Sequence, residues 1–202
     1  MGKIPRSAAL RLKGKIMSQQ TVSFTQMKNG TREDYELLER LENEYCRGLP
    51  DRLLAALRGL ENTLSGYQVS RLEHSLQSAT RAEAASETEE YVIAALLHDI
   101  GDEIAPHSHS ELAAAVLRPY VSDKVHWIIK YHGIFQMFYY AHHVGGDKNA
   151  REKYRTHQWF DEAVRFCEEY DQNCFDPTFE SKPLEYFEPA LRRIFSRPPF
   201  FE

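Results

Sequence analysis

The sequence predicts an all-α fold, and three observations lead to it. From Thr31 onward, apolar residues recur at the three- and four-residue spacing of amphipathic helices, as in Leu37, Leu38 and Leu41. No segment alternates apolar and polar residues over the length of a strand. Histidines and aspartates that could bind metal are spread over several predicted helices, and such a cluster needs a bundle whose axis they all face.

The predicted helices are bounded by residues that favour helix ends. Thr31 and Asp34 favour the start of the first helix, and Gly48 favours its end. Gly101 ends the most apolar run, which we expect to be the central buried helix, and Gly133 separates two later helices. The predicted helices cover residues 31–48, 50–60, about 69–79, 87–98, 108–117, 122–131, 134–143, 147–157, 159–173 and 183–195.

Composition favours one globular domain over residues 31–202, preceded by a basic lead over residues 1–30 that we expect to be disordered. A transit peptide, or an extension before Met17, is another interpretation of this lead. The net charge of −5 argues against a nucleic-acid partner, and no apolar stretch approaches a membrane span. Three cysteines without metal-site or disulfide spacing favour the cytoplasm. The oligomeric state stays open.

The adjacent His98 and Asp99, at the end of the apolar run, have the clearest chemistry. Neighbours on a helix point about 100° apart, so both can reach one site only where the helix ends, and Gly101 supplies that end. Imidazole and carboxylate together suit transition metals, and six such ligands suffice for two metal ions. We expect Asp99 to bridge the two ions. The candidate ligands are His74, His98, Asp99, His109, His132 and Asp171.

Two of these positions have competitors that spacing alone cannot separate. His107 competes with His109, which we prefer because small residues one turn later would let its helix pack close to the metals. Asp171 is preferred because it follows an apolar stripe that favours an inward-facing carboxylate. Its competitors are Glu168, Glu169 and Asp176.

The ligand order His…His-Asp…His…His…Asp resembles the HD-domain superfamily in its dinuclear form. Within it, the sequence resembles the mixed-valent di-iron oxygenases that cleave 1-hydroxyphosphonates, which are relatives of myo-inositol oxygenase. The segments LEHSLQ (72–77) and AALLHDIG (94–101) are similar to theirs, and Tyr170-Asp171 stands at their Trp-Asp. The resemblance covers residues 64–171. It implies an HD-domain helical bundle around a dinuclear site, with catalytic His98 and Asp99, an Fe(II)/Fe(III) pair and O2 as co-substrate.

The sequence departs from those enzymes around the expected substrate. Gln136 replaces a substrate-binding Lys, Asp102 replaces a His, and Leu64 and Tyr67 replace a Tyr and a Glu. The replacements suggest a changed substrate, because aromatic rings beside carboxylates suit a quaternary ammonium group. The hypothesis is (R)-1-hydroxy-2-(trimethylammonio)ethylphosphonate, giving glycine betaine and phosphate, as in the trimethylammonium-specific branch. The residues behind this hypothesis are Tyr67, Asp102, Glu103, Phe135, Phe138, Tyr139 and Tyr140.

The phosphonate group also needs cations. Arg71 lies one turn before His74, where its guanidinium could grip two phosphonate oxygens. A second set of cations follows Gly145-Gly146. The expected substrate-binding residues are therefore Tyr67, Arg71, Asp102, Gln136, Lys148 and Arg151.

The alternative function is an HD-type, metal-dependent phosphohydrolase that acts on a nucleotide or another phosphate ester. The two additional histidines between His98-Asp99 and Asp171 fit an oxygenase better, although some dinuclear phosphodiesterases also have them. A regulatory HD domain without catalysis fits less well, because every ligand position is filled.

Overall fold

The computed structural model describes residues 21–200, and the chain forms two compact units, Met1–Cys46 and Arg47–Glu202. In the first unit, η1 (Met27–Asn29) precedes α1 (Arg32–Arg47). The backbone N–H and hydroxyl of Ser23 donate to the Asp34 carboxylate at 2.7 and 2.8 Å. The expected disorder of the lead therefore does not extend to residues 21–30, and residues 1–20 lie outside the described residues. Where the main domain begins stays a prediction.

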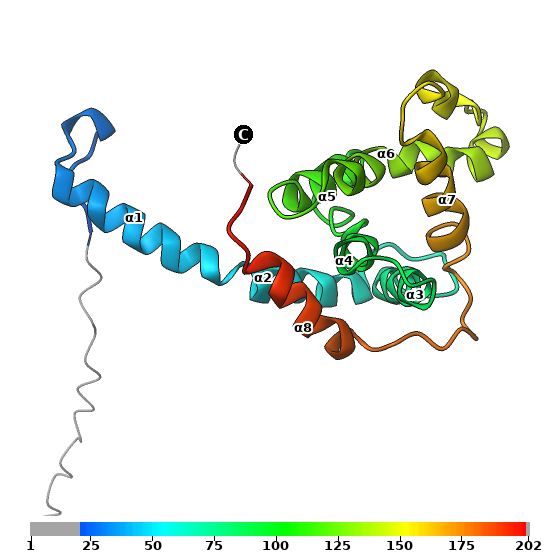
Figure 1. Ribbon diagram of the computed structural model, residues 1–202, viewed down its shortest axis with the longest axis horizontal. Helices are drawn as coiled ribbons and strands as arrows, with labels where there is room; N and C mark the ends of the chain where they lie inside the picture. Colours follow the sequence, from blue (N-terminus) through cyan, green and yellow to red (C-terminus); the bar gives the residue numbers. More distant parts are fainter. Residues whose placement is uncertain (1–20, 201–202) are drawn as a thin grey trace, which may run out of the picture. The chain divides into compact units, whose positions relative to one another are not determined.

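The second unit is built from helices alone (Figure 1). No strand occurs between residues 21 and 200, which confirms the predicted all-α class. Its elements are α2 (Leu49–Gly59), η2 (Leu60–Asn62), α3 (Arg71–Ala84), α4 (Glu89–Leu97), α5 (His109–Leu117), α6 (Asp123–Tyr140), η3 (Ala141–Val144), η4 (Ala150–Tyr154), α7 (Phe160–Tyr170) and α8 (Leu184–Phe195).

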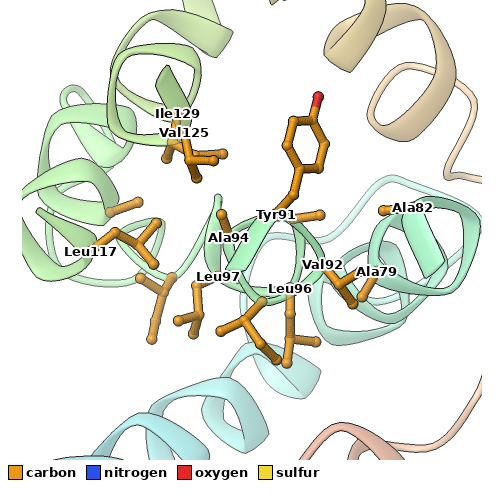
Figure 2. Packing of buried hydrophobic residues seen from close by; sticks show 14 of the residues in the cluster. Ala79, Ala82, Tyr91, Val92, Ala94, Leu96, Leu97, Leu117, Val125 and Ile129 are labelled. Carbon is orange, nitrogen blue, oxygen red and sulfur yellow. The ribbon is translucent and has the colours of Figure 1, made fainter. Parts of the chain in front are cut away.

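Helix α4 is the central buried helix, as its apolar sequence predicts. Thr88 caps it by accepting a hydrogen bond from the backbone N–H of Tyr91, and the residues that follow are buried on all sides. It packs against α3, α6 and α8. Figure 2 shows its side chains pointing in several directions, with Val92 beside Ala79 of α3 and Leu97 toward Leu117 of α5.

The turn after α4 places Asp99 beside His109. The helix ends at Leu97, and the chain turns through His98 to Ile104 before α5 begins. A Cβ atom on Gly101 would lie 2.8 Å from both Cα and the carbonyl oxygen of His109. Only glycine lets this turn approach the first residue of α5 so closely, and the approach brings His109 next to Asp99.

Two predictions were wrong in the region after α5, one of a helix break and one of a helix. The predicted break at Gly133 does not exist, because α6 runs unbroken from Asp123 to Tyr140. Gly133 serves close packing instead, since a Cβ atom there would lie 2.7 Å from the Ser110 hydroxyl on α5. The helix predicted over residues 147–157 is only the short 3-10 helix η4, Ala150–Tyr154.

The longest helices do not resemble membrane spans. Helix α6 has 18 residues, and neither it nor any other helix between residues 21 and 200 combines the length and apolar character that a bilayer crossing requires.

Candidate metal centre

Three histidines at the centre of the bundle have the same ring nitrogen bound to a backbone carbonyl. The Nδ1 atoms of His98 and His132 lie 2.7 Å from the carbonyl oxygens of Ala95 and Ile129, three residues earlier in each case. The Nδ1 atom of His74 lies 3.0 Å from the carbonyl oxygen of Cys174. A carbonyl can only accept, so each Nδ1 carries a proton and each Nε2 is left to bind a second proton or a metal ion. Metal-binding histidines are held in this way.

The Nε2 atoms of His74 and His98 converge on each other and on two buried carboxylates. His74 Nε2 and His98 Nε2 lie 3.0 Å apart, and both rings are fully buried. Two lone pairs at this distance repel unless a proton or a metal ion lies between or beside them. Asp171 lies next to them, and its Oδ2 atom is buried without a hydrogen-bond partner. The donor set and this orphaned oxygen fit a metal ion.

The two oxygens of Asp99 face different histidines. Its Oδ2 lies 3.2 Å from His74 Nε2 and 3.1 Å from His98 Nε2. Its Oδ1 lies 3.4 Å from His132 Nε2 and 3.5 Å from His109 Nε2. A carboxylate placed in this way fits a bridge between two metal ions. One ion would take His74, His98 and Asp171, and the other would take His109 and His132.

The structure places the competing residues apart from this cluster. His107 is exposed on the turn before α5, whereas the His109 side chain is 24% exposed and lies beside Asp99 and Asp102. Asp171, the residue that ends α7, is fully buried. Its former competitors Glu168, Glu169 and Asp176 are exposed.

The buried carboxylates hold positive charge at this site. Burial by itself lowers the pKa of His98, but Asp99 and Asp171 outweigh burial and raise the pKa to about 10. Burial raises the pKa of Asp99, but His98 and Arg71 hold it well below its usual range. The pKa of Asp171 is likewise lowered, by His74 and His98 against the effect of burial. A metal ion would therefore replace protons that these groups attract.

Arg71 lies at the cluster but is already engaged. Its Nε donates to Asp102 at 2.7 Å, and its Nη2 donates to Asp99. The side chain is buried, and its guanidinium lies 5.4 Å from the centre of the Tyr67 ring. Arg71 therefore sits between the metal ligands and Tyr67, while Asp102 holds Arg71 and approaches His109.

A pocket with aromatic walls adjoins the cluster. It has a volume of about 240 Å³ and contains no charged residue in its lining. Two contacts join it to the metal ligands: Gln136 Nε2 donates to Asp171 Oδ1 at 2.6 Å, and the Phe175 ring stacks on His74 with centroids 4.4 Å apart. The lining residues are Tyr67, Gln136, Tyr139, Tyr140, Gln172 and Phe175.

Other residues expected near the substrate lie elsewhere. Phe135 is fully buried in the core against Trp127 and Phe160. Arg151 and Lys148 lie over the Phe138 ring, at 3.7 and 5.7 Å from its centre, and none of these residues lines the pocket. Asp102 and Glu103 do not line it either. The carboxylates expected beside the aromatic rings are therefore absent from the pocket lining.

Sequence reasoning missed Phe175 and Gln172, which follow α7 and complete the pocket wall. It also missed the three carbonyl groups that orient the histidines. The carbonyls of Ala95 and Ile129 could have been found from the i−3 spacing, because each lies three residues before its histidine. No signal in the sequence points to Cys174 and Phe175, since they meet His74 only through tertiary packing.

Comparisons with known proteins agree with this site. Residues 71–158 match the HD domain family model, a segment from α3 to η4 that contains all candidate ligands except Asp171. Over 100 residues, the chain is 35% identical to [1-hydroxy-2-(trimethylamino)ethyl]phosphonate dioxygenase (glycine-betaine-forming) from Leisingera caerulea. That similarity covers 44% of this chain and 48% of the relative, so the chain matches about half of the relative's length. The matched segment and the His/Asp cluster fit a metal-binding site of the HD type, and over this part the chain is similar to a phosphonate dioxygenase.

Proposed function

We propose that this protein is a di-iron, O2-dependent oxygenase that cleaves the carbon–phosphorus bond of a 1-hydroxyphosphonate. The preferred substrate is (R)-1-hydroxy-2-(trimethylammonio)ethylphosphonate. The overall reaction takes up one O2 and breaks the bond between C1 and phosphorus. It yields glycine betaine and phosphate, with the electrons for O2 reduction coming from C1 and the C–P bond. The activity for which the Leisingera caerulea relative is named supports this substrate.

The single observation behind the proposal is the division of the Asp99 carboxylate between two sets of ligands. Oδ2 faces His74 and His98, while Oδ1 faces His109 and His132. A site for one metal would not need imidazoles on both sides of one carboxylate. Two iron ions held here would supply a Lewis acid for the substrate oxygens and a redox-active site for O2, while the net electrons come from the substrate.

Arg71 is the residue best placed to bind the phosphonate. Its guanidinium lies at the cluster and beside Tyr67, which lines the pocket. A dianionic phosphonate bound next to the metals would compete with Asp99 and Asp102 for this cation. Lys148 and Arg151 remain candidates, and the Nε and Nη1 atoms of the buried Arg151 have no hydrogen-bond partner.

The aromatic pocket supports a trimethylammonium group at the other end of the substrate. The aromatic rings of Tyr67, Tyr139 and Tyr140 line the pocket, and a quaternary ammonium needs no hydrogen-bond acceptor. Gln136 lines the same pocket without charge and donates to Asp171 Oδ1 at 2.6 Å. A lysine there would repel a cationic substrate, so glutamine is compatible with the proposal.

The test measures O2 uptake and phosphate release together, in protein loaded anaerobically with iron and given the trimethylated or the unmethylated hydroxyphosphonate. We expect equal amounts of O2 consumed and phosphate formed, with faster turnover of the trimethylated compound. Equal or faster turnover of the unmethylated compound would contradict the proposal that the pocket binds the trimethylammonium group. Phosphate release from phosphate esters without O2 uptake would support the hydrolase instead.

Arg71→Ala is the matching variant, with Arg155→Ala as control because Arg155 is exposed and paired with Glu152. We expect Arg71→Ala to raise KM sharply and Arg155→Ala to leave KM unchanged. An unchanged KM in Arg71→Ala would remove this residue from the substrate site.

A further inference from the structure

We infer that Phe175 is a positioning residue that fixes the His74 imidazole and, through its other face, connects this metal ligand to the aromatic pocket. The inference depends on the proposed function only in taking His74 as a metal ligand. Its first test measures metal binding and requires no turnover.

The Phe175 ring is stacked on both faces. On one side it stacks on His74, with centroids 4.4 Å apart and ring planes 22° from parallel. On the other side it stacks on Tyr67, at 4.8 Å and 19°. The three rings form a continuous stack from the buried metal ligand to the half-exposed Tyr67, with Phe175 in the middle.

Cys174, the residue before Phe175, is hydrogen-bonded to the same imidazole. The carbonyl oxygen of Cys174 accepts the Nδ1 hydrogen of His74 at 3.0 Å. A hydrogen bond at Nδ1 fixes the tautomer and one point of the ring, but the ring can still rotate about that direction. Stacking against Phe175 removes this freedom, so Cys174 and Phe175 together define where Nε2 points.

No other element described here can replace this contact from the same side. The His74 ring also meets the His98 ring, but at 58°, so the two are tilted rather than stacked. Phe175 lies in an irregular segment after α7, only four residues beyond Asp171. One short segment therefore supplies a carboxylate ligand, a carbonyl that holds His74 and a ring that orients it.

Phe175 is also a wall of the pocket, together with Tyr67. A substrate group that fills the pocket would contact Tyr67 and the edge of Phe175, and the Phe175 ring stacks on both Tyr67 and His74. The geometry therefore allows the pocket's occupant to affect the metal ligand without touching it.

The experiment titrates Co²⁺ into metal-free protein against a competing chelator. The variants are Phe175→Leu and Phe175→Met, which remove the ring but keep an apolar side chain, and Phe175→Tyr, which keeps the ring. Phe179→Leu is the matched control, since Phe179 is a half-buried ring in the same segment that stacks under Arg81 and has no ring contact with His74. The melting temperature of each metal-free variant checks folding separately.

We expect Phe175→Leu and Phe175→Met to bind one of two Co²⁺ ions roughly tenfold more weakly, with a changed visible absorption spectrum for that ion. Phe175→Tyr should keep the Co²⁺ affinity and the absorption spectrum of the unmodified protein, and so should Phe179→Leu. Unchanged Co²⁺ affinity in both ring-deleted variants would overturn the inference. An equal loss in Phe179→Leu would also overturn it, because the effect would then come from general loosening of the segment.

A second readout separates this inference from the proposed function. If hydroxyphosphonates are turned over, Phe175→Leu at saturating metal should still show a raised KM, because the pocket wall has changed. If they are not turned over, the proposed function fails while the Co²⁺ result still decides the role of Phe175.

Discussion

At the residue scale, the candidate centre depends on which nitrogen of each histidine is free. Backbone carbonyls take the Nδ1 hydrogens of His74, His98 and His132, and this leaves every Nε2 directed at the carboxylates of Asp99 and Asp171. His109 differs, because its Nδ1 faces Asp102 at 3.6 Å rather than a carbonyl. A carboxylate therefore faces the Nδ1 side of His109, where the other three histidines have a backbone carbonyl.

The first prediction contrasts the two histidines at the start of α5. His109→Ala should lower bound metal from two ions per chain toward one, because His109 lies on only one side of Asp99. His107→Ala should leave both ions bound, since His107 is exposed on the preceding turn. Elemental analysis of purified variants measures this. Equal metal content in the two variants would contradict the assignment of His109.

At the element scale, glycines allow the turn after α4 and the middle of α6 to approach α5. The two contacts differ in kind. Gly101 faces the backbone of His109, which cannot move without shifting the start of α5, whereas Gly133 faces the Ser110 hydroxyl, which can rotate. We therefore expect an added methyl group to be tolerated at Gly133 but not at Gly101.

The second prediction follows from this difference. Gly101→Ala should destabilise the protein by about 1–3 kcal/mol, because the added methyl group overlaps backbone atoms. Gly133→Ala should be close to neutral, since the Ser110 hydroxyl can rotate away and the higher helix propensity of alanine contributes about 1 kcal/mol. Chemical denaturation of both variants gives the free energies of unfolding. A larger loss for Gly133→Ala would show that α5 and α6 tolerate less movement than this contact suggests.

The third prediction concerns the pH dependence of the segment before α1. Backbone N–H groups of Thr31 and Ser23, with their hydroxyls, lower the pKa of Asp34 from 3.8 to about 2. A lowered folded-state pKa means that the stabilisation is complete above 3.8 and is lost as the pH falls through about 2. Amide exchange of Ser23, followed by NMR, should therefore speed up as the pH falls across this range, after correction for the intrinsic rate.

Asp34→Asn is the control for that measurement. Asparagine keeps one acceptor oxygen but cannot titrate, so protection of Ser23 should be weaker and should not change over the same pH range. If the unmodified protein and Asp34→Asn show the same pH profile, Asp34 does not hold the segment.

At the scale of the whole second unit, the candidate ligands come from elements that are far apart in the sequence. His74 is on α3, His132 is on α6 and Asp171 ends α7, while His98 and Asp99 follow α4. Metal ions bound here would tie these elements together. They would also relieve the repulsion between the buried Nε2 atoms of His74 and His98.

The fourth prediction is that metal raises the stability of the fold. At a free metal concentration of 100 times Kd, the stabilisation is about 2.7 kcal/mol per ion, provided the unfolded chain binds weakly. Calorimetry with and without Co²⁺ should show a higher melting temperature for the loaded protein. Asp171→Asn should reduce this increase, because one ion loses its carboxylate ligand. An unchanged melting temperature on loading would contradict metal binding across the bundle.

The sequence by itself determined the all-α class, the central place of α4 and the set of candidate ligands around His98-Asp99. These follow from apolar periodicity and from the chemistry of residue types, both of which are local properties. Sequence reasoning failed at Gly133, because a glycine that permits close packing looks the same in sequence as one that ends a helix. The preference for His109 over His107 rested on small residues one turn away, and only the structure placed His109 beside Asp99.

Only the tertiary structure decided how the ligands divide around Asp99 and what lies beside them. The Cys174 carbonyl and the Phe175 ring meet His74 across about one hundred residues of sequence, so no local pattern reveals them. The structure also shows that Phe135, expected near the substrate, is buried in the core. It shows that Arg71 is hydrogen-bonded to Asp99 and Asp102. Helix periodicity gives the face on which a residue lies, but the neighbour on that face is set by how whole helices pack.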